Sequence, residues 1–456
     1  MAVRRRDLLA GVAAFAGFAT VGLLPGTAAA ATRQRPGAQL PPSLAIGDRA
    51  VVARASARRA MEHLQVLSNE IGPRIGGTPS EHRAADYIAG VLRKLRYDVT
   101  LQPFPVADKY LADISVTGDR GPKWQSGASP QGKLDVTVSG AVVDVGTATP
   151  AELAHVRGQI AFIPDSQVNS NAPRLAAEAG AIAVLLSRPG SPSRKLGAFT
   201  PALPAPLDVP VLGLAQVQGE RLRQKLAAGP VRLSLTVTHH KNLTSYNVIA
   251  ERPATLPNPD NGVVMVSAHY DSVPGSPGAN DDGSGTVLCL ELARVLRYLP
   301  TQKAIRFALW GSEEQGLIGS RHYVKQLSDA DAERIAGCFQ NDMVATSWDP
   351  AIVYWLLSVD GGDNNTTKAV AGAAQRLGYQ QRTKGPVARG SSDHVPFHER
   401  GISSANFSWR GETGPALLEP TYHTPEDTIA ANVSGERLQV SLELIGSAAY
   451  ELARQR

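Results

Sequence analysis

The fold is decided by the stretch Val263-Val264-Met265-Val266-Ser267-Ala268-His269-Tyr270-Asp271, an apolar run that ends in polar residues. A short, uninterrupted apolar run predicts a strand that is buried on both faces. Further strands are expected at residues 304–310, 339–344, 352–357 and 404–409. Helical patterns lie between or after them, at residues 286–299, 317–327, 367–377 and 433–452. This alternation predicts an α/β fold with a mainly parallel (mixed) central sheet and helices on both faces.

Polar side chains that can bind metal follow these expected strands. Because sites in such sheets lie at the carboxyl ends of the strands, we expect these side chains to meet at one edge. One of them lies in a glycine-rich turn at residues 278–285, and another lies in the segment 422–428. The set consists of His269, Asp271, Asp281, Glu313, Glu314, Asp342 and His423.

The residue types in this set point to hydrolysis at two metal ions. Asp271 can bind the far imidazole nitrogen of His269, and Asp281 can bridge two cations through its two oxygens. Of the adjacent Glu313 and Glu314, one can bind metal while the other accepts a proton from water. Mixed nitrogen and oxygen ligands suit zinc, with cobalt or manganese as alternatives. Each motif alone is weak evidence, and only their joint occurrence at successive strand ends predicts the site.

These motifs resemble those of the zinc exopeptidases of the bacterial leucyl aminopeptidase type, peptidase family twenty-eight. The resemblance extends to residues 71–74 and 392–397, so it spans the chain from about residue 55 onward, apart from an insertion. It implies two Zn²⁺ ions per chain. One ion is then held by His269 and Asp342, the other by Glu314 and His423, and Asp281 bridges them.

The same resemblance implies roles for three further residues. Glu313 is expected to be the general base, and Asp271 is expected to support His269. Tyr422 is expected to donate a hydrogen bond to the oxyanion. The implied activity is removal of N-terminal residues, expected to be apolar, from peptides.

Residues 111–240 differ in character from the rest, with short β segments and few clustered acids. They resemble a protease-associated domain, a small β-rich α/β insertion. The zinc peptidase domain is then formed by residues 51–110 and 241–456. For the insertion, a role in substrate access or protein contact and a packing role without a ligand both stay open.

The N-terminal residues 1–31 have the pattern of an export signal. Arg4-Arg5-Arg6-Asp7-Leu8-Leu9 leads into an apolar run, and small residues of a cleavage site follow. The paired arginines indicate the twin-arginine route and a secreted protein. A membrane anchor is the alternative. Residues 32–50 are expected to form a linker.

The composition of the chain limits the classes of partner that we expect it to bind. The chain of 456 residues has a net charge of +5 and no basic tract interleaved with aromatic residues, which argues against nucleic acid. After signal cleavage no membrane contact is expected. Cys289 and Cys338 predict two buried thiols or one disulfide. The oligomeric state stays open.

Three other functions are alternatives on this fold. A carboxypeptidase needs a cationic clamp, for which Arg389 or Arg410 is available. A glutaminyl cyclase-like enzyme does without the first histidine, so His269 argues against it. A non-catalytic binding protein typically loses ligands or the base, and all are present. Asp393 and His394 are expected to support the site from a loop.

Overall fold

The computed structural model describes residues 45–456, except residues 120, 122, 192 and 258. The expected export signal and most of the expected linker lie outside the described residues. The last residues of that linker are helical, because helix α1 spans Ile46–Val52. In the described part of the chain, no helix combines the length and the apolar character that a bilayer crossing needs.

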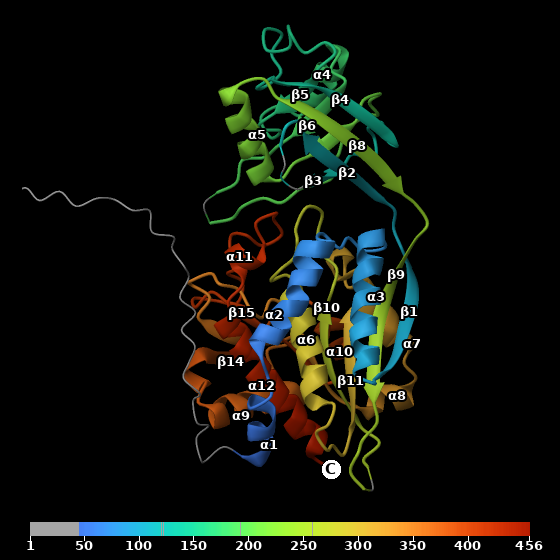
Figure 1. Cartoon of the computed structure of the whole chain (residues 1–456), viewed down its shortest axis with the longest axis vertical. Coiled ribbons are helices and arrows are strands. Elements are labelled where there is room, and N and C mark those ends of the chain that lie inside the picture. The colour runs from blue at the N-terminus through green and yellow to red at the C-terminus, as the bar shows by residue number, and fades with distance from the viewer. Residues whose placement is uncertain (1–44, 120, 122, 192, 258) are drawn as a thin grey trace, which may run out of the picture. The chain divides into compact units, whose positions relative to one another are not determined.

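An eight-stranded mixed sheet forms the core of the expected peptidase domain (Figure 1). Its central strands are parallel neighbours, and antiparallel strands join them on both sides. This arrangement confirms the expected fold class. In spatial order the strands are β1 (Asp98–Val106), β9 (Leu243–Arg252), β11 (Ala304–Trp310), β10 (Val263–His269), β12 (Ile335–Asn341), β15 (Ser404–Arg410), β13 (Val353–Ser358) and β14 (Thr383–Ala388).

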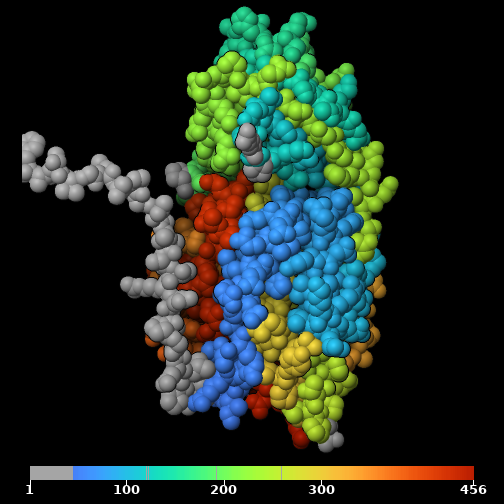
Figure 2. Space-filling view, in the orientation of Figure 1, coloured from blue at the N-terminus to red at the C-terminus, as the bar shows by residue number. Residues whose placement is uncertain are grey.

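Helices cover both faces of this sheet. Side chains of the central strands point alternately to the two faces, so they pack into two separate cores. Val264 and Val266 of β10 pack with one layer of helices, and Val263 and Met265 pack with the other. Helix α12 also packs beside α1 and α2, so the two ends of the described chain lie side by side (Figure 2). The first layer contains α1, α2 (Ala57–Leu64), α3 (Pro79–Lys94), α6 (Gly283–Leu296), α9 (Asn365–Leu377) and α12 (Gly435–Arg454), and the second contains α7 (Ile318–Gln326), α8 (Asp329–Arg334) and α10 (His394–Glu399).

The insertion folds as a closed barrel with its own apolar core. It leaves and re-enters the larger sheet through two paired strands, because Val106 at the end of β1 lies opposite Leu243 at the start of β9. The barrel can therefore be inserted without interrupting the larger sheet. Its elements are β2 (Lys109–Val116), β3 (Trp124–Ala128), β4 (Val136–Asp144), β5 (Ile160–Ile163), α4 (Ala172–Glu178), β6 (Ala183–Leu186), β7 (Val211–Gly213), α5 (Gln216–Ala228) and β8 (Arg232–His240).

Three expectations from the sequence differ from the structure. Strand β12 starts and ends earlier than residues 339–344, and Met343 lies beyond it with a φ of 65°, which no strand residue adopts. Strand β14, with Gly385 and Pro386, was not expected because it is a half-exposed edge strand. His394 does not lie in a loop, since it is the first residue of helix α10, whereas Asp393 lies in the turn just before that helix.

A buried acid, Glu81 of α3, connects this helix to the strands that carry the site. Its Oε2 accepts from the Gly77 amide at 2.5 Å, and its Oε1 accepts from the Ser245 hydroxyl at 2.6 Å and the Ser312 hydroxyl at 3.5 Å. Burial, together with the nearby charge of Asp271, raises the pKa of Glu81 to about 8. The folded protein therefore holds a proton here that the unfolded chain releases at lower pH.

We expect Glu81→Gln to reduce the pH dependence of stability. Because the folded pKa lies above the unfolded one, Glu81 stabilises the fold least at high pH, and stability falls as the pH rises towards about 8. Melting temperatures of the wild type and the variant, measured between about pH 5 and pH 8, check this. The exposed Glu333→Gln serves as the control, and an unchanged pH profile in Glu81→Gln would contradict the prediction.

Candidate metal centre

The structure brings all the predicted metal-binding side chains together at the carboxyl edge of the larger sheet. His269 ends β10, and Asp342 directly follows β12. Glu313 and Glu314 lie in a short 3₁₀ turn, Glu313–Gln315, just after β11. Asp281 lies in the turn before α6, and His423 lies in the loop between β15 and the short helix α11 (Ile429–Asn432). Segments far apart in the sequence thus meet where parallel strands end.

Two groups of side chains are spaced so that each can hold a metal ion. In the first group, the candidate ligand atoms of His269, Asp281 and Asp342 lie within 4.8 Å of one another. His269 Nε2 is 3.3 Å from Asp281 Oδ1 and 3.9 Å from Asp342 Oδ1. The imidazole therefore faces the carboxylates with Nε2, the nitrogen that is available to a metal.

The second group consists of Asp281, Glu314 and His423, again within 4.8 Å. His423 Nε2 is 3.1 Å from Asp281 Oδ2 and 3.0 Å from Glu314 Oε2. Asp281 belongs to both groups, with one oxygen toward each histidine. The division into groups coincides with the one that the family resemblance implies, and the assignment of these residues as ligands stays a prediction.

The unsatisfied atoms of this cluster fit a metal. Several buried donor and acceptor atoms have no hydrogen-bond partner among the described residues, although such atoms normally have one. Burial and the neighbouring charge of Asp281 raise the pKa of Glu314 to about 7, and burial likewise raises the pKa of Asp342. The buried carboxylates repel one another, and bound cations would relieve this repulsion. The mixed set of nitrogen and oxygen donors suits zinc. The atoms of the cluster without a hydrogen bond are His269 Nδ1, Asp281 Oδ2, Glu314 Oε1, Asp342 Oδ1 and His423 Nε2, and the last lies 3.1 Å from Asp281 Oδ2.

Asp271 connects the first histidine to the glutamate pair. Its Oδ1 lies 3.5 Å from His269 Nδ1. The same carboxylate accepts from the backbone amides of Glu313 at 2.9 Å and Glu314 at 3.3 Å. One buried side chain thus faces the imidazole and holds the turn that carries both glutamates, in keeping with the supporting role that the sequence suggests.

Two further aspartates hold the loops, and neither was assigned a role from the sequence. Asp282 caps α6 and accepts from the amides of His269 and Met343 at 3.2 Å each. Asp427 accepts from the amides of Asn280 and Asp281 at 3.0 Å each. Asp282 lies next to Asp281, and Asp427 lies four residues after His423, so both belong to the segments that the sequence singled out. Their partners are backbone amides, which a sequence pattern cannot reveal.

A cavity of about 60 Å³ lies against the cluster. Besides Glu313 and the candidate ligands other than His423, it is lined by Met343, Arg389, Ser391, Arg410, Leu418 and Tyr422. The Tyr422 ring stacks on His423 with ring centroids 3.7 Å apart. Burial and the charges of nearby carboxylates raise the pKa of Tyr422, so its hydroxyl keeps its proton. Arg410 is buried at this cavity.

Other residues that the sequence singled out lie outside the cluster. His239 and His240 end the barrel strand β8, where His239 Nε2 lies 2.8 Å from Asp108. Cys289 and Cys338 are buried free thiols, which confirms the first of the two interpretations. Asp393 is buried near the site and accepts from the Ser320 hydroxyl at 2.5 Å and from Gln340 Nε2 at 3.2 Å.

We expect Asp427→Asn to weaken metal binding about tenfold or more, since partners that orient ligands typically have effects of this size. The amide would present a donor to the backbone N–H groups of Asn280 and Asp281, which displaces the turn that carries Asp281. Competition with a chromogenic zinc chelator measures the affinity. Asp360→Asn, at an exposed turn where the carboxylate accepts from Gly362, is the matched control. Equal affinity in wild type and Asp427→Asn would contradict the prediction.

Comparison with known proteins agrees with this fold. Residues 247–449 match the family described as Peptidase family M28. Aminopeptidase YwaD of Bacillus subtilis (strain 168) is 39% identical over 404 residues, which cover 88% of this chain and 85% of that protein. The structure of BSAP, a zinc aminopeptidase from Bacillus subtilis, superposes with a TM-score of 0.62 at 36% identity, covering 88% of this chain and 96% of that one. An aminopeptidase from Aneurinibacillus sp. strain AM-1 superposes with a TM-score of 0.57 at 32% identity, covering 90% and 97%.

The chain therefore belongs to peptidase family M28. It is an enzyme, a peptide hydrolase, and the resemblance found in the sequence is confirmed for the peptidase domain. The family match begins within β9, after the barrel, so it leaves the identity of the insertion as a prediction.

Proposed function

We propose that this chain is a zinc-dependent aminopeptidase that uses two ions to remove N-terminal residues from peptides. The observation that carries the proposal is a pair of three-residue donor groups that share Asp281. The similar chains named above, which are described as aminopeptidases, support it. One ion would be held by His269, Asp281 and Asp342, and the other by Asp281, Glu314 and His423. Bound zinc would act as a Lewis acid that polarises the scissile carbonyl and makes water acidic enough to attack near neutral pH.

Glu313 is the residue that we propose as general base. It lies 4.0 Å from His269 Nε2, yet it belongs to neither donor group. Burial and the charges of Asp393 and Glu314 raise its pKa, which makes its carboxylate a ready proton acceptor. As water attacks the scissile carbon, Glu313 takes a proton from it. Glu313 then gives this proton to the amine nitrogen as the carbon–nitrogen bond breaks.

Tyr422 is the residue that we propose stabilises the charge that develops on the carbonyl oxygen. It lines the same cavity as Glu313 and keeps its hydroxyl proton. A protonated hydroxyl can donate to an oxyanion, and such donors contribute most when they are fixed in advance. The stacking of its ring on His423 fixes the ring relative to the metal centre.

The carboxylates that line the cavity favour an exopeptidase that acts on N-terminal residues. An N-terminal amine is a cation, and carboxylates such as Asp281 and Glu313 attract it. A carboxypeptidase on the same fold is the second candidate, because two arginines line this cavity.

Export by the twin-arginine pathway and secretion belong to this proposal, on the pattern of residues 1–31 alone. The barrel, which matches the expected insertion closely, is proposed to be a protease-associated domain. The substrates are the N-termini of peptides or proteins.

The proposed function predicts cleavage of aminoacyl-p-nitroanilides that stops with a chelator and returns with zinc. N-acetylated substrates should not be cleaved, because the free amine is needed for binding. Peptides with amidated C-termini should still be cleaved. A protein that carries two zinc ions but cleaves none of the aminoacyl substrates would contradict the aminopeptidase assignment and favour another amide hydrolase.

Glu313→Gln should lower kcat by about a hundredfold or more, since a general base contributes a factor of this size. The amide has the shape of the carboxylate but accepts no proton, so the protein should still bind two metal ions. Steady-state kinetics and elemental analysis of the same preparation measure both properties. Wild-type kcat in this variant would rule out Glu313 as the base.

His423→Ala is the matched contrast to that variant. It removes a proposed ligand rather than the base, so metal occupancy should fall together with activity. Full occupancy in His423→Ala would remove this residue from the proposed ligand set.

A further inference from the structure

Two arginines share the cavity with the candidate metal centre, which has an excess of acids. Arg410 is the last residue of β15 and is 2% exposed. Arg389 follows β14, and its carbonyl oxygen is held at 2.8 Å by His394 Nε2. Both line the cavity beside Met343 and Leu418. A substrate group that enters this cavity therefore meets both arginine residues.

Neither guanidinium is satisfied by the protein. The Nε atoms of Arg389 and Arg410 are buried and have no partner among the described residues. Arg410 makes one long hydrogen bond, from Nη1 to the Pro415 carbonyl at 3.5 Å. In the described part of the chain, neither side chain forms an ion pair. Buried charges are normally paired, since an unpaired one costs free energy.

The carboxylate of Asp342 does not account for the charge of the two arginines. Asp342 interacts electrostatically with both, but it is a candidate ligand, and a bound cation would take up its charge. Burial and the like charge of Arg410 lower the pKa of Arg389, so the two cations repel each other. Two neighbouring cations without an anion are the arrangement that an incoming carboxylate would stabilise.

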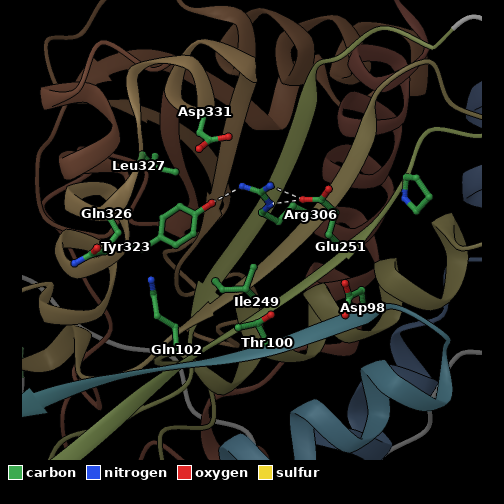
Figure 3. Close-up of a pocket in the computed structure, with 11 residues that line it drawn as sticks. Asp98, Thr100, Gln102, Ile249, Glu251, Arg306, Tyr323, Gln326, Leu327 and Asp331 are labelled. Atoms are coloured by element: carbon green, nitrogen blue, oxygen red, sulfur yellow. Dashed lines mark hydrogen bonds and ion pairs between the residues drawn. The ribbon is translucent and has the colours of Figure 1, made fainter.

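A second hollow on the same domain contains an arginine whose guanidinium group is paired (Figure 3). This hollow of about 510 Å³ lies over β1, β9, β11 and α7, and Arg306 lines it. Arg306 Nε donates to Glu251 Oε2 at 2.6 Å, and its Nη1 donates to the Tyr323 hydroxyl. That hollow therefore offers no unpaired cation to a ligand, in contrast to the cavity at the metal centre.

We propose that Arg389 and Arg410 form a carboxylate-binding subsite that selects an acidic side chain on the residue to be removed. This inference rests on the proposed aminopeptidase function. An N-terminal glutamate or aspartate would place its side-chain carboxylate on the two guanidinium groups, which bind carboxylates by paired hydrogen bonds. Met343 and Leu418 would contact its methylene carbons. This preference replaces the apolar one expected from the sequence.

A carboxylate at this subsite has a second source, the C-terminal carboxylate of a peptide. Substrates can separate the two. Glutamyl and glutaminyl p-nitroanilides differ in side-chain charge but have almost the same shape. N-acetylated peptides, with a free or an amidated C-terminus, report on the other source.

The wild-type enzyme should cleave the glutamyl substrate with a kcat/KM about tenfold or more above that of the glutaminyl substrate, given the strength of charged hydrogen bonds. Equal or lower kcat/KM for the glutamyl substrate would overturn the proposed subsite, while leaving the aminopeptidase function in place. No cleavage of any aminoacyl substrate would instead overturn the proposed function. Release of C-terminal residues from N-acetylated peptides, lost on amidation, would assign the arginines to the α-carboxylate and overturn both proposals.

Arg410→Met should lower kcat/KM for the glutamyl substrate by about 10–100-fold and leave the glutaminyl substrate within about threefold. Arg410→Lys, which keeps the charge but loses the paired hydrogen bonds, should fall between them. Arg321→Met, on the exposed face of α7, is the control. If both Arg410 variants lose metal and cleave both substrates equally poorly, Arg410 only balances charge, and the proposal is wrong. Arg389→Met provides the same test at the second arginine.

Discussion

The burial of many carboxylates at one edge of the sheet is the constraint on which the site depends. A buried carboxylate needs backbone donors or a cation. Asp271, Asp282 and Asp427 take backbone amides and thereby hold the loops in place. Asp281 and Asp342 retain oxygens without a hydrogen-bond partner in the described chain. The loop conformations and the affinity for metal therefore have the same origin.

The elements with strong patterns were predicted well from the sequence. Strands β10 and β11 are apolar on both faces, so their limits were visible in composition alone. Strand β14 was missed because an edge strand needs no apolar run and this one contains Pro386. The limits of β12 were displaced because apolar residues continue into the turn at Met343. In these cases tertiary context, rather than local pattern, determines the structure.

The candidate site, too, was predicted from the sequence only in part. The types and order of His269, Asp281 and His423 indicate metal chemistry before any coordinates, because few other functions need that set. The supporting aspartates could not be assigned, since their partners are backbone amides. The burial of Arg410 could not be foreseen either. An arginine at a strand end is usually exposed, and only the packing of the loops around the cavity encloses it.

Asp281 faces His269 with one oxygen and His423 with the other, and this has a consequence for metal uptake. In the proposed two-ion site, an ion at one position would fix the orientation of the shared carboxylate and so favour binding at the other. The same ion would also place positive charge beside the second position, which opposes binding there. The sum of the two effects would be a coupling free energy, which must be the same whichever position fills first. Metal loading of the proposed site would thus be a linked equilibrium, coupled through the side chain of Asp281.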